Sequence, residues 1–160
     1  MTLNIRTHQA GDIGWIISQH GLIYTSEFGF DPNFEIHIAN KFVNLFGPDC
    51  PEFNTIWIMQ SNGQRAGSIA VWKKSESIAF INFVILKKEF RGQGFSRSLL
   101  DKVIQHCKLH NYKVVELETY SCLASARELY KKYGFVVIQT DENMDVFGQS
   151  LNREFWQLTL

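Results

Sequence analysis

The chain has 160 residues, 45% hydrophobic and 20% charged, which is a globular composition long enough for one domain over 1–160. The 16 basic and 16 acidic side chains cancel, which argues against a nucleic-acid partner held on a broad positive face. The apolar runs are too short to cross a membrane and the N-terminal residues lack a secretory signal, so the sequence predicts a cytoplasmic protein without a membrane partner.

The first third of the chain predicts a short strand and two helices. Residues 3–7 alternate apolar and polar side chains, as a strand does. Asp12 is the expected cap of a first helix, whose apolar stripe recurs at three- and four-residue intervals up to Phe28. Asp31-Pro32 is a helix-start signal, and the second helix is expected to end at Gly47-Pro48.

The remaining two thirds predict a strand-rich region with two further helices. Strands are expected over 54–60 and 66–74, joined by a hairpin turn, and over 78–86, which is apolar enough for burial on both faces. A helix from Phe95 to about His110, a strand over 114–119, a helix over 126–133 and a strand over 135–139 follow. The polar segment 139–151 is expected to be a substrate-covering loop whose acids favour a cationic acceptor, and 153–160 a last strand. This order predicts an α/β fold, a mixed sheet with helices on its faces.

The cysteines and histidines predict no metal site and no disulfide framework. Cys50, Cys107 and Cys122 are odd in number and widely spaced, so free thiols are expected. His106 and His110 stand four apart on one helix face, but the sequence offers no third ligand beside them.

The turn RGQGFS at 91–96 lies between an apolar strand and a helix. Amides at a helix start lack intrahelical partners and carry the positive end of the helix dipole, so they bind anions. Gly92 and Gly94 have no Cβ and Ser96 is small, so phosphate oxygens can approach the backbone. A P-loop would need Lys-Ser or Lys-Thr after the last glycine, and a dinucleotide fold would need a third glycine where Arg97 stands.

Two motifs in order resemble those of the GNAT acyl-CoA N-acetyltransferases. RGQGFS at 91–96 resembles the pyrophosphate loop of that family, and AxxLYxxxGF at 126–135 resembles its downstream segment. GDIGW at 11–15, HG at 20–21 and FG at 147–148 resemble the acetyltransferase half of proteins in which a MarR-type DNA-binding domain precedes a GNAT domain. The resemblance implies a GNAT-like three-layer sandwich, with a mostly antiparallel sheet of about seven strands that splays at the cofactor site.

The resemblance also implies acetyl-CoA as co-substrate and no metal. Amides over 91–97 would hold the pyrophosphate, and the pantetheine arm would lie along 84–86, where this strand splays from 114–119. A strand amide near Ile85 would polarise the thioester carbonyl, a contact worth roughly 3 kcal/mol. Leu123 stands where the family often has an asparagine that helps to hold the cofactor. The expected cofactor-binding residues are Val84, Ile85, Leu86, Arg91, Gly92, Gln93, Gly94, Phe95, Ser96 and Arg97.

The catalytic candidates are Tyr130 and Glu118. Tyr130 matches the family tyrosine that protonates the departing thiolate, and the alternative is a core aromatic on an amphipathic helix. The acceptor ammonium must lose a proton, which Asn82 cannot take although relatives often carry a glutamate on its strand. Glu118 is the candidate base, with a water chain as a second route. The alternative is that Glu116 and Glu118 are a solvated pair at a sheet edge.

The acceptor is expected to meet His20, Tyr24 and Glu27 of the first helix. The alternative is that His20 and Tyr24 are satisfied core residues. The predicted function is transfer of an acetyl group from acetyl-CoA to a primary amine, small or peptide, by direct attack in a ternary complex. A non-catalytic acyl-CoA-binding sensor or an interaction domain is the alternative, and a homodimer is left open.

Overall fold

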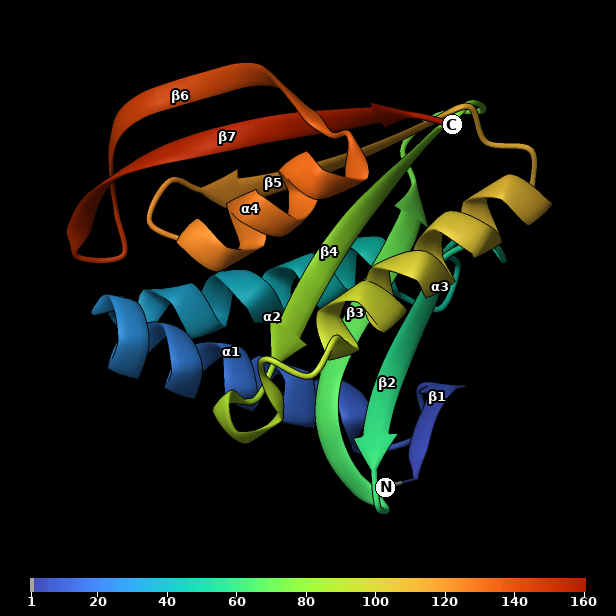
Figure 1. The fold of residues 1–160 in the computed structure, drawn as a ribbon. Coiled ribbons are helices and arrows are strands. Elements are labelled where there is room, and N and C mark those ends of the chain that lie inside the picture. The colour runs from blue at the N-terminus through green and yellow to red at the C-terminus, as the bar shows by residue number, and fades with distance from the viewer. Residues whose placement is uncertain (1) are drawn as a thin grey trace.

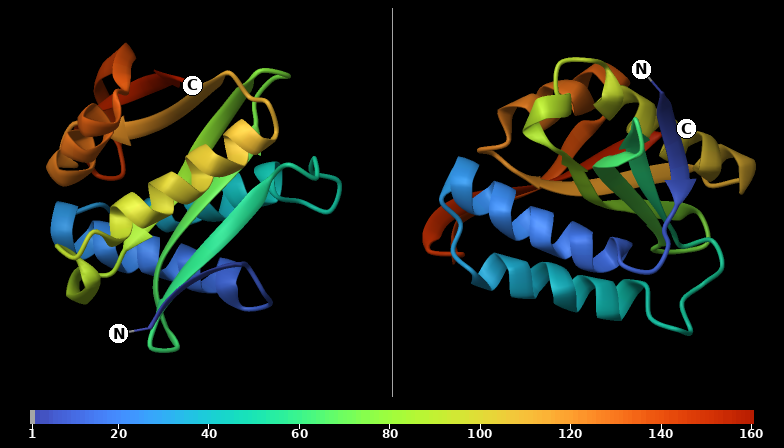
Figure 2. Two further views of the ribbon diagram at one scale, coloured as in Figure 1. Left: turned by 45° about the vertical axis from the view of Figure 1, so that its right-hand side comes forward. Right: turned by 90° about the horizontal axis from the view of Figure 1, so that it is seen from below.

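The computed structural model describes residues 2–160 as three layers around one seven-stranded sheet (Figure 1). Helices α1 and α2 lie side by side on one face, and α3 and α4 lie on the other (Figure 2). The helices are α1 Asp12–Phe28, α2 Asn33–Leu45, α3 Phe95–Leu109 and α4 Ala124–Tyr133. The strands are β1 Leu3–Thr7, β2 Thr55–Ser61, β3 Gln64–Lys73, β4 Ile78–Leu86, β5 Val114–Tyr120, β6 Val136–Val146 and β7 Gln149–Thr159.

The sheet opens between β4 and β5. The strand order is β1-β2-β3-β4-β5-β7-β6, and β4 and β5 are parallel while the other neighbours are antiparallel. Only Ile78–Ile81 of β4 pair with β5, opposite Val114–Leu117. Beyond these residues the two strands diverge, as Figure 1 shows. The predicted mixed sheet and its splay are therefore confirmed.

A bulge in β4 lies where the strand leaves β5. Ser68 of β3 is opposite Ile85 and Ala70 is opposite Asn82, so Phe83 and Val84 together face one residue of β3. Phe83 has a φ of 57°, in the left-handed region. The Ser68 hydroxyl donates a 2.7 Å hydrogen bond to the Phe83 carbonyl oxygen, which satisfies a polar group that the bulge removes from the ladder.

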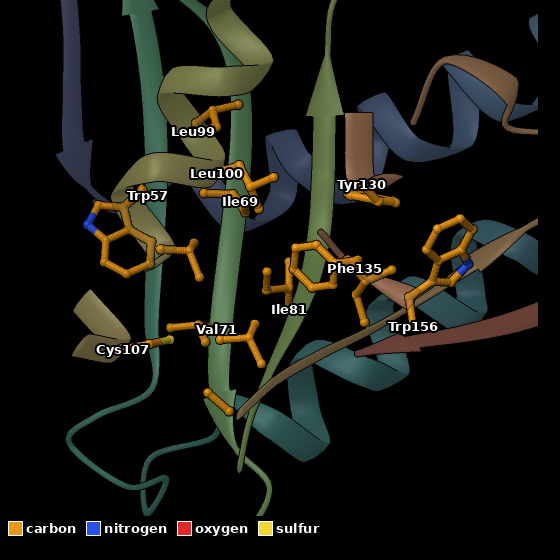
Figure 3. Close-up of a cluster of buried hydrophobic side chains, with 14 of the residues drawn as sticks. Trp57, Ile69, Val71, Ile81, Leu99, Leu100, Cys107, Tyr130, Phe135 and Trp156 are labelled. Atoms are coloured by element: carbon orange, nitrogen blue, oxygen red, sulfur yellow. The ribbon is translucent and has the colours of Figure 1, made fainter. Parts of the chain in front are cut away.

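Each face of the sheet has its own hydrophobic core. The α3/α4 face buries the cluster drawn in Figure 3, whose members include Leu99, Val103, Tyr130 and Trp156. The α1/α2 face buries a second cluster that is rich in phenylalanine. Phe83 belongs to this second cluster and stacks on Phe42 of α2 with ring centroids 3.8 Å apart. This stacking offsets the strain of the left-handed conformation at Phe83.

The expectation of a loop over 139–151 is wrong, because this segment is a β-hairpin. Strand β6 continues to Val146, pairs with Gln149, and leaves Phe147 and Gly148 as a two-residue turn with φ of 52° and 76°. The turn lacks the usual Asn-Gly signal of a hairpin. Its conformation at Phe147 is held instead by packing on Phe30, with ring centroids 5.6 Å apart. Because β6 is an edge strand with mostly exposed side chains, its sequence does not alternate between apolar and polar residues. The usual strand pattern is therefore missing there.

Candidate active site

The glycine turn at the start of α3 presents unpaired amides. Gly92 and Gly94 have φ of 76° and 81°, and a Cβ built at either would meet no atom within 4 Å. Among the described residues 2–160, the amides of 92–97 find no hydrogen-bond acceptor, and Gly94 caps the helix without a side-chain bond. These amides stand at the positive end of a helix of 15 residues, which is an arrangement suited to an anion.

A cleft of about 610 Å³ leads from this turn to α4. Val84 and Ile85 line it, and its far wall is formed by residues 122–126 and by Tyr130. Of the ten predicted cofactor-binding residues, Gln93 does not line the cleft, and its side chain instead lies 3.5 Å from the Glu89 carbonyl oxygen. The other nine all contribute to the wall: Val84, Ile85, Leu86, Arg91, Gly92, Gly94, Phe95, Ser96 and Arg97.

Glu27 lies on this cleft and pairs with Arg91. The Arg91 guanidinium donates to both Glu27 carboxylate oxygens, at 2.5 and 2.8 Å, and to the Leu86 carbonyl oxygen at 3.0 Å. Hydrogen bonding from Arg91 lowers the pKa of the Glu27 carboxyl. Because the charge of Arg91 is thus already paired, Arg97 and Lys132 are the lining cations without an ion pair among the described residues. Sequence reasoning did not single out Lys132.

A second, smaller cavity of about 100 Å³ lies on the α2 side of the splay. It shares five lining residues with the cleft, namely Tyr24, Val84, Leu123, Ala126 and Tyr130. The two spaces therefore meet at the open end of the β4–β5 pair. Among the predicted substrate residues, His20 and Tyr24 line this cavity and Glu27 does not.

Tyr130 lies at the junction of the two spaces. Its side chain is buried against Phe135 and Trp156, and its burial raises the pKa of the phenol to about 12. The phenol therefore keeps its proton at neutral pH, as a general acid requires. Tyr130 is a core aromatic that also lines both spaces, and its role as the acid stays a prediction.

His20 and Tyr24 stack on one another at the wall of the cavity. Their ring centroids are 5.8 Å apart, and the His20 Nδ1 donates a 2.8 Å hydrogen bond to the Ile16 carbonyl oxygen. A carbonyl oxygen can only accept, so the proton of the neutral ring is on Nδ1 and Nε2 keeps a lone pair. The pKa of His20 is lowered to about 4, mainly by burial and to a smaller extent by the charge of Lys41, while the hydrogen bond to Ile16 acts in the opposite direction.

Glu118 lines the cavity and forms an ion pair with Lys41 of α2. The interpretation of Glu116 and Glu118 as a solvated edge pair is wrong, because β5 is an inner strand. Glu116 is buried and is paired with Lys74, 2.5 Å away. Sequence reasoning missed Lys41, whose only signal is its place beside the apolar stripe of α2, next to Phe42.

The hydrogen bonding of two further polar residues of the cavity, Asn82 and Thr119, was not predicted from the sequence. The Trp72 indole N–H donates to the Asn82 Oδ1 at 2.6 Å, which uses one lone pair of this oxygen, and the Asn82 amide N–H groups have no acceptor among residues 2–160. The Thr119 hydroxyl is buried and has no hydrogen-bond partner among residues 2–160. Buried hydroxyls that have no protein partner are commonly paired by an ordered water or a bound molecule.

Within the described part of the chain, no group of three or more histidine, cysteine or acidic residues is placed to hold a metal ion. His106 bonds the Phe53 carbonyl oxygen through Nε2 at 3.0 Å, and His110 bonds the carbonyl of His106. The predicted acids of 139–151 stand on the β6–β7 hairpin, where Asp141 pairs with Arg153, and none of them lines the cavity. No helix over residues 2–160 is long and apolar enough to span a membrane.

The arrangement of a bulged β4, a splayed β5 and a helix start at the glycine turn defines the class of the fold. An acetyltransferase of the GNAT family from Staphylococcus aureus Mu50 aligns over 99% of both chains with a TM-score of 0.79 and 22% identity. A GNAT family acetyltransferase from Elizabethkingia anophelis, solved with acetyl-CoA bound, covers 99% of this chain and 98% of its own, with a TM-score of 0.74 and 19% identity. At these identities the likeness shows the fold, and it confirms the predicted GNAT architecture.

Sequence similarity identifies the family. The model described as "Acetyltransferase (GNAT) family" matches residues 23–135, which is most of the chain. The chain belongs to this family, as its two motifs predict. The N-acetylaspartate synthetase of Danio rerio is 27% identical over 112 residues, which are 68% of this chain and 40% of that protein. The chain thus spans about two fifths of the length of the N-acetylaspartate synthetases it matches.

Proposed function

We propose that residues 1–160 form one domain that transfers the acetyl group of acetyl-CoA to a primary amine by direct attack in a ternary complex. The observation that carries this proposal is the meeting of the cleft and the cavity at Tyr130 and Val84. A thioester in the cleft and an amine in the cavity would be neighbours there. No covalent intermediate on the protein is then needed, because the two reactants meet directly.

The residues of the cleft fit coenzyme A. The unpaired amides of 92–97 would hold the pyrophosphate, with Arg97 and Lys132 adding positive charge. The pantetheine arm would lie along Val84–Leu86, which β5 leaves unpaired. Acetyl-CoA, when bound, supplies the acetyl group as a thioester. Leu123 lines both spaces where relatives often have an asparagine, so cofactor anchoring rests on the backbone.

The chemistry requires a base, a polarising donor and an acid. The amine nitrogen attacks the carbonyl carbon, and the carbon–sulfur bond breaks. The acceptor ammonium gives up two protons in all: one goes through Glu118 or a water chain to solvent, and the second balances the proton that Tyr130 gives to the thiolate. A β4 amide near Ile85 polarises the carbonyl. Glu118 can accept a proton only when the ammonium competes with Lys41 for its carboxylate.

The test is thiol release from acetyl-CoA with a panel of amines, amino acids, polyamines and peptides. Tyr130→Phe is expected to lower kcat about 100-fold or more, because the acid is removed, and to leave the Kd for coenzyme A within about threefold of the wild-type value. Calorimetry measures the second quantity. If coenzyme A binds but no amine in the panel releases thiol, the acyl-CoA sensor replaces the enzyme. If coenzyme A does not bind, the enzyme and the sensor are both excluded, and the interaction domain is the interpretation that is left.

The proposal also includes the cellular compartment and the oligomeric state of the protein. The three free cysteines, Cys50, Cys107 and Cys122, are typical of a reducing compartment such as the cytoplasm. A homodimer would most simply pair through the exposed edge strand β6, which carries exposed Val136, Val137 and Ile138. The finer resemblance to MarR-type fusion proteins stays a sequence-based prediction and adds no regulatory function to the proposal.

A further inference from the structure

The small cavity carries two opposite charges and no net charge. Lys41 and Glu118 are the only lysine, arginine or acidic residues of the described chain that line it, and they form an ion pair. His20, also in the wall, is neutral at pH 7 because its pKa is about 4, and burial lowers the pKa of His37 as well. The rest of the wall is largely aromatic or aliphatic, as Phe34 and Phe83 illustrate.

Around this ion pair stand polar groups that the protein itself does not satisfy. Thr119 is 4% exposed, and its buried hydroxyl lacks a hydrogen-bond partner among residues 2–160. The Asn82 side chain lines the cavity, and its N–H groups have no acceptor among the described residues, while its oxygen already accepts from Trp72. His20 keeps a lone pair on Nε2. The wall of the cavity thus offers both donors and acceptors, and a bound molecule that presents both kinds of group would pair with them.

We infer that the acceptor is a zwitterionic α-amino acid with an uncharged side chain; this inference rests on the proposed function. The ammonium and carboxylate of such a molecule stand on one carbon, so it can enter the Lys41–Glu118 pair and form two pairs in its place. The carboxylate takes Lys41, with Asn82 as a second donor. The ammonium takes Glu118, to which it gives its first proton before attack on the thioester.

Other classes of amine fit this cavity less well. A polyamine brings two or more positive charges to a cavity with one carboxylate, and that carboxylate already faces Lys41. A peptide N-terminus lacks the adjacent carboxylate and would leave Lys41 unpaired. An acidic amino acid adds a second carboxylate where one lysine is available. The volume of about 100 Å³ also favours a small acceptor.

The experiment compares matched acceptors on the wild-type protein. Thiol release is measured with L-alanine, alaninamide and ethylamine, with L-leucine, leucinamide and 3-methylbutylamine, and with aspartate, spermidine and a short peptide. We expect kcat/KM for each free amino acid to exceed that of its amide and its amine by tenfold or more. Aspartate, spermidine and the peptide are expected to fall below alanine and leucine.

Two substitutions locate the preference. Lys41→Met is expected to bring the ratio of leucine to leucinamide toward one, and Lys41→Arg is expected to keep it. The matched control is Lys74→Met, which removes the ion pair of Lys74 with Glu116, a residue of β5 two positions before Glu118 that does not line the cavity. This control is expected to leave the ratio unchanged.

Three results overturn the inference. One is a spermidine, peptide or amide rate that equals or exceeds the amino-acid rate, and another is a preference that survives Lys41→Met in folded protein. In both cases acetyl transfer itself is intact, so the proposed function stands. Absence of thiol release with every acceptor overturns the proposed function together with the inference. The wild-type comparison decides the question even if Lys41→Met does not fold.

Discussion

His20 illustrates at the scale of one residue how burial sets chemistry. Its ring is 2% exposed, lies between Tyr24 and Phe83, and has one nitrogen committed to the Ile16 carbonyl oxygen. The sequence predicts only that a histidine stands in the apolar stripe of a helix. The tautomer and the lowered pKa follow from neighbours on α1, α2 and β4, which are brought together by folding.

The burial of His20 predicts a dependence of stability on pH. The folded pKa of about 4 lies below the usual 6.5, so the unfolded chain binds the proton more readily. The stabilisation is therefore complete above pH 6.5 and is lost as the pH falls to about 4, by up to roughly 3 kcal/mol. Urea unfolding of wild type and His20→Asn between pH 4 and 7.5 measures this loss. Asparagine keeps the donor to Ile16, and the slope specific to His20 should vanish.

The control for this prediction is His8→Asn, at an exposed position. It should leave the slope of the wild-type protein in place. An equal slope in His20→Asn and wild type would show that this ring is not the source of the acid sensitivity.

At the scale of the element, the bulge of β4 connects sheet geometry to the site. The extra residue of the bulge places Val84 in the wall that the cleft and the cavity share. Gly67 of β3 leaves room for the bulged segment of β4. A Cβ at Gly67 would stand 2.4 Å from the Ile85 carbonyl oxygen, so only glycine allows this approach. The bulge is thus built from both strands.

Ser68→Ala tests the role of the bulge. The substitution leaves the buried Phe83 carbonyl without its 2.7 Å hydrogen bond, which we expect to lower the free energy of unfolding by about 1–3 kcal/mol. Because Val84 moves with the bulge, kcat for acetyl transfer should fall as well. Ser61→Ala is the matched control, at a buried serine of β2 whose hydroxyl bonds none of the described residues. A Ser68→Ala protein with wild-type stability and kcat would contradict this role.

At the scale of the whole molecule, the cleft joins elements from both layers of helices. Glu27 of α1, the strand β4, the glycine turn and α4 all contribute to its wall, and the Glu27–Arg91 ion pair links α1 to the turn. A ligand that contacts all of these is expected to stabilise the entire fold. Binding to the folded state alone contributes about 2.7 kcal/mol at a ligand concentration of 100 times Kd.

Coenzyme A at that concentration should raise the melting temperature by about 5–10 °C, as measured by differential scanning fluorimetry. Gly94→Val should remove most of this shift, because a side chain there enters open space beside the amides that hold phosphate. Gly63→Val is the matched control: Gly63 has a φ of 79°, open surroundings and a similar strain, but it lies in the β2–β3 turn. Equal shifts in the two variants would place the cofactor elsewhere.

Much of the fold could be predicted from the sequence because its signals are local. Apolar periodicity locates α1, α2 and α3, and the glycine spacing of 91–96 marks an anion-binding helix start. With the segment 126–135, this turn predicts the acetyltransferase family and places Tyr130 on its helix. The hairpin of β6 and β7 could not be predicted in this way, because Phe147 adopts its turn conformation only through packing on Phe30.

The sequence by itself thus determined the family, the order of elements and the turn that presents its amides, since each depends on neighbours within a few residues. Tertiary structure decided the acceptor side. Lys41 and Glu118 are 77 residues apart, Trp72 orients Asn82 across two strands, and Thr119 is buried without a partner only because β4 and β5 part there. Charge pairing and burial are set by distance in space, which no local pattern in the chain records.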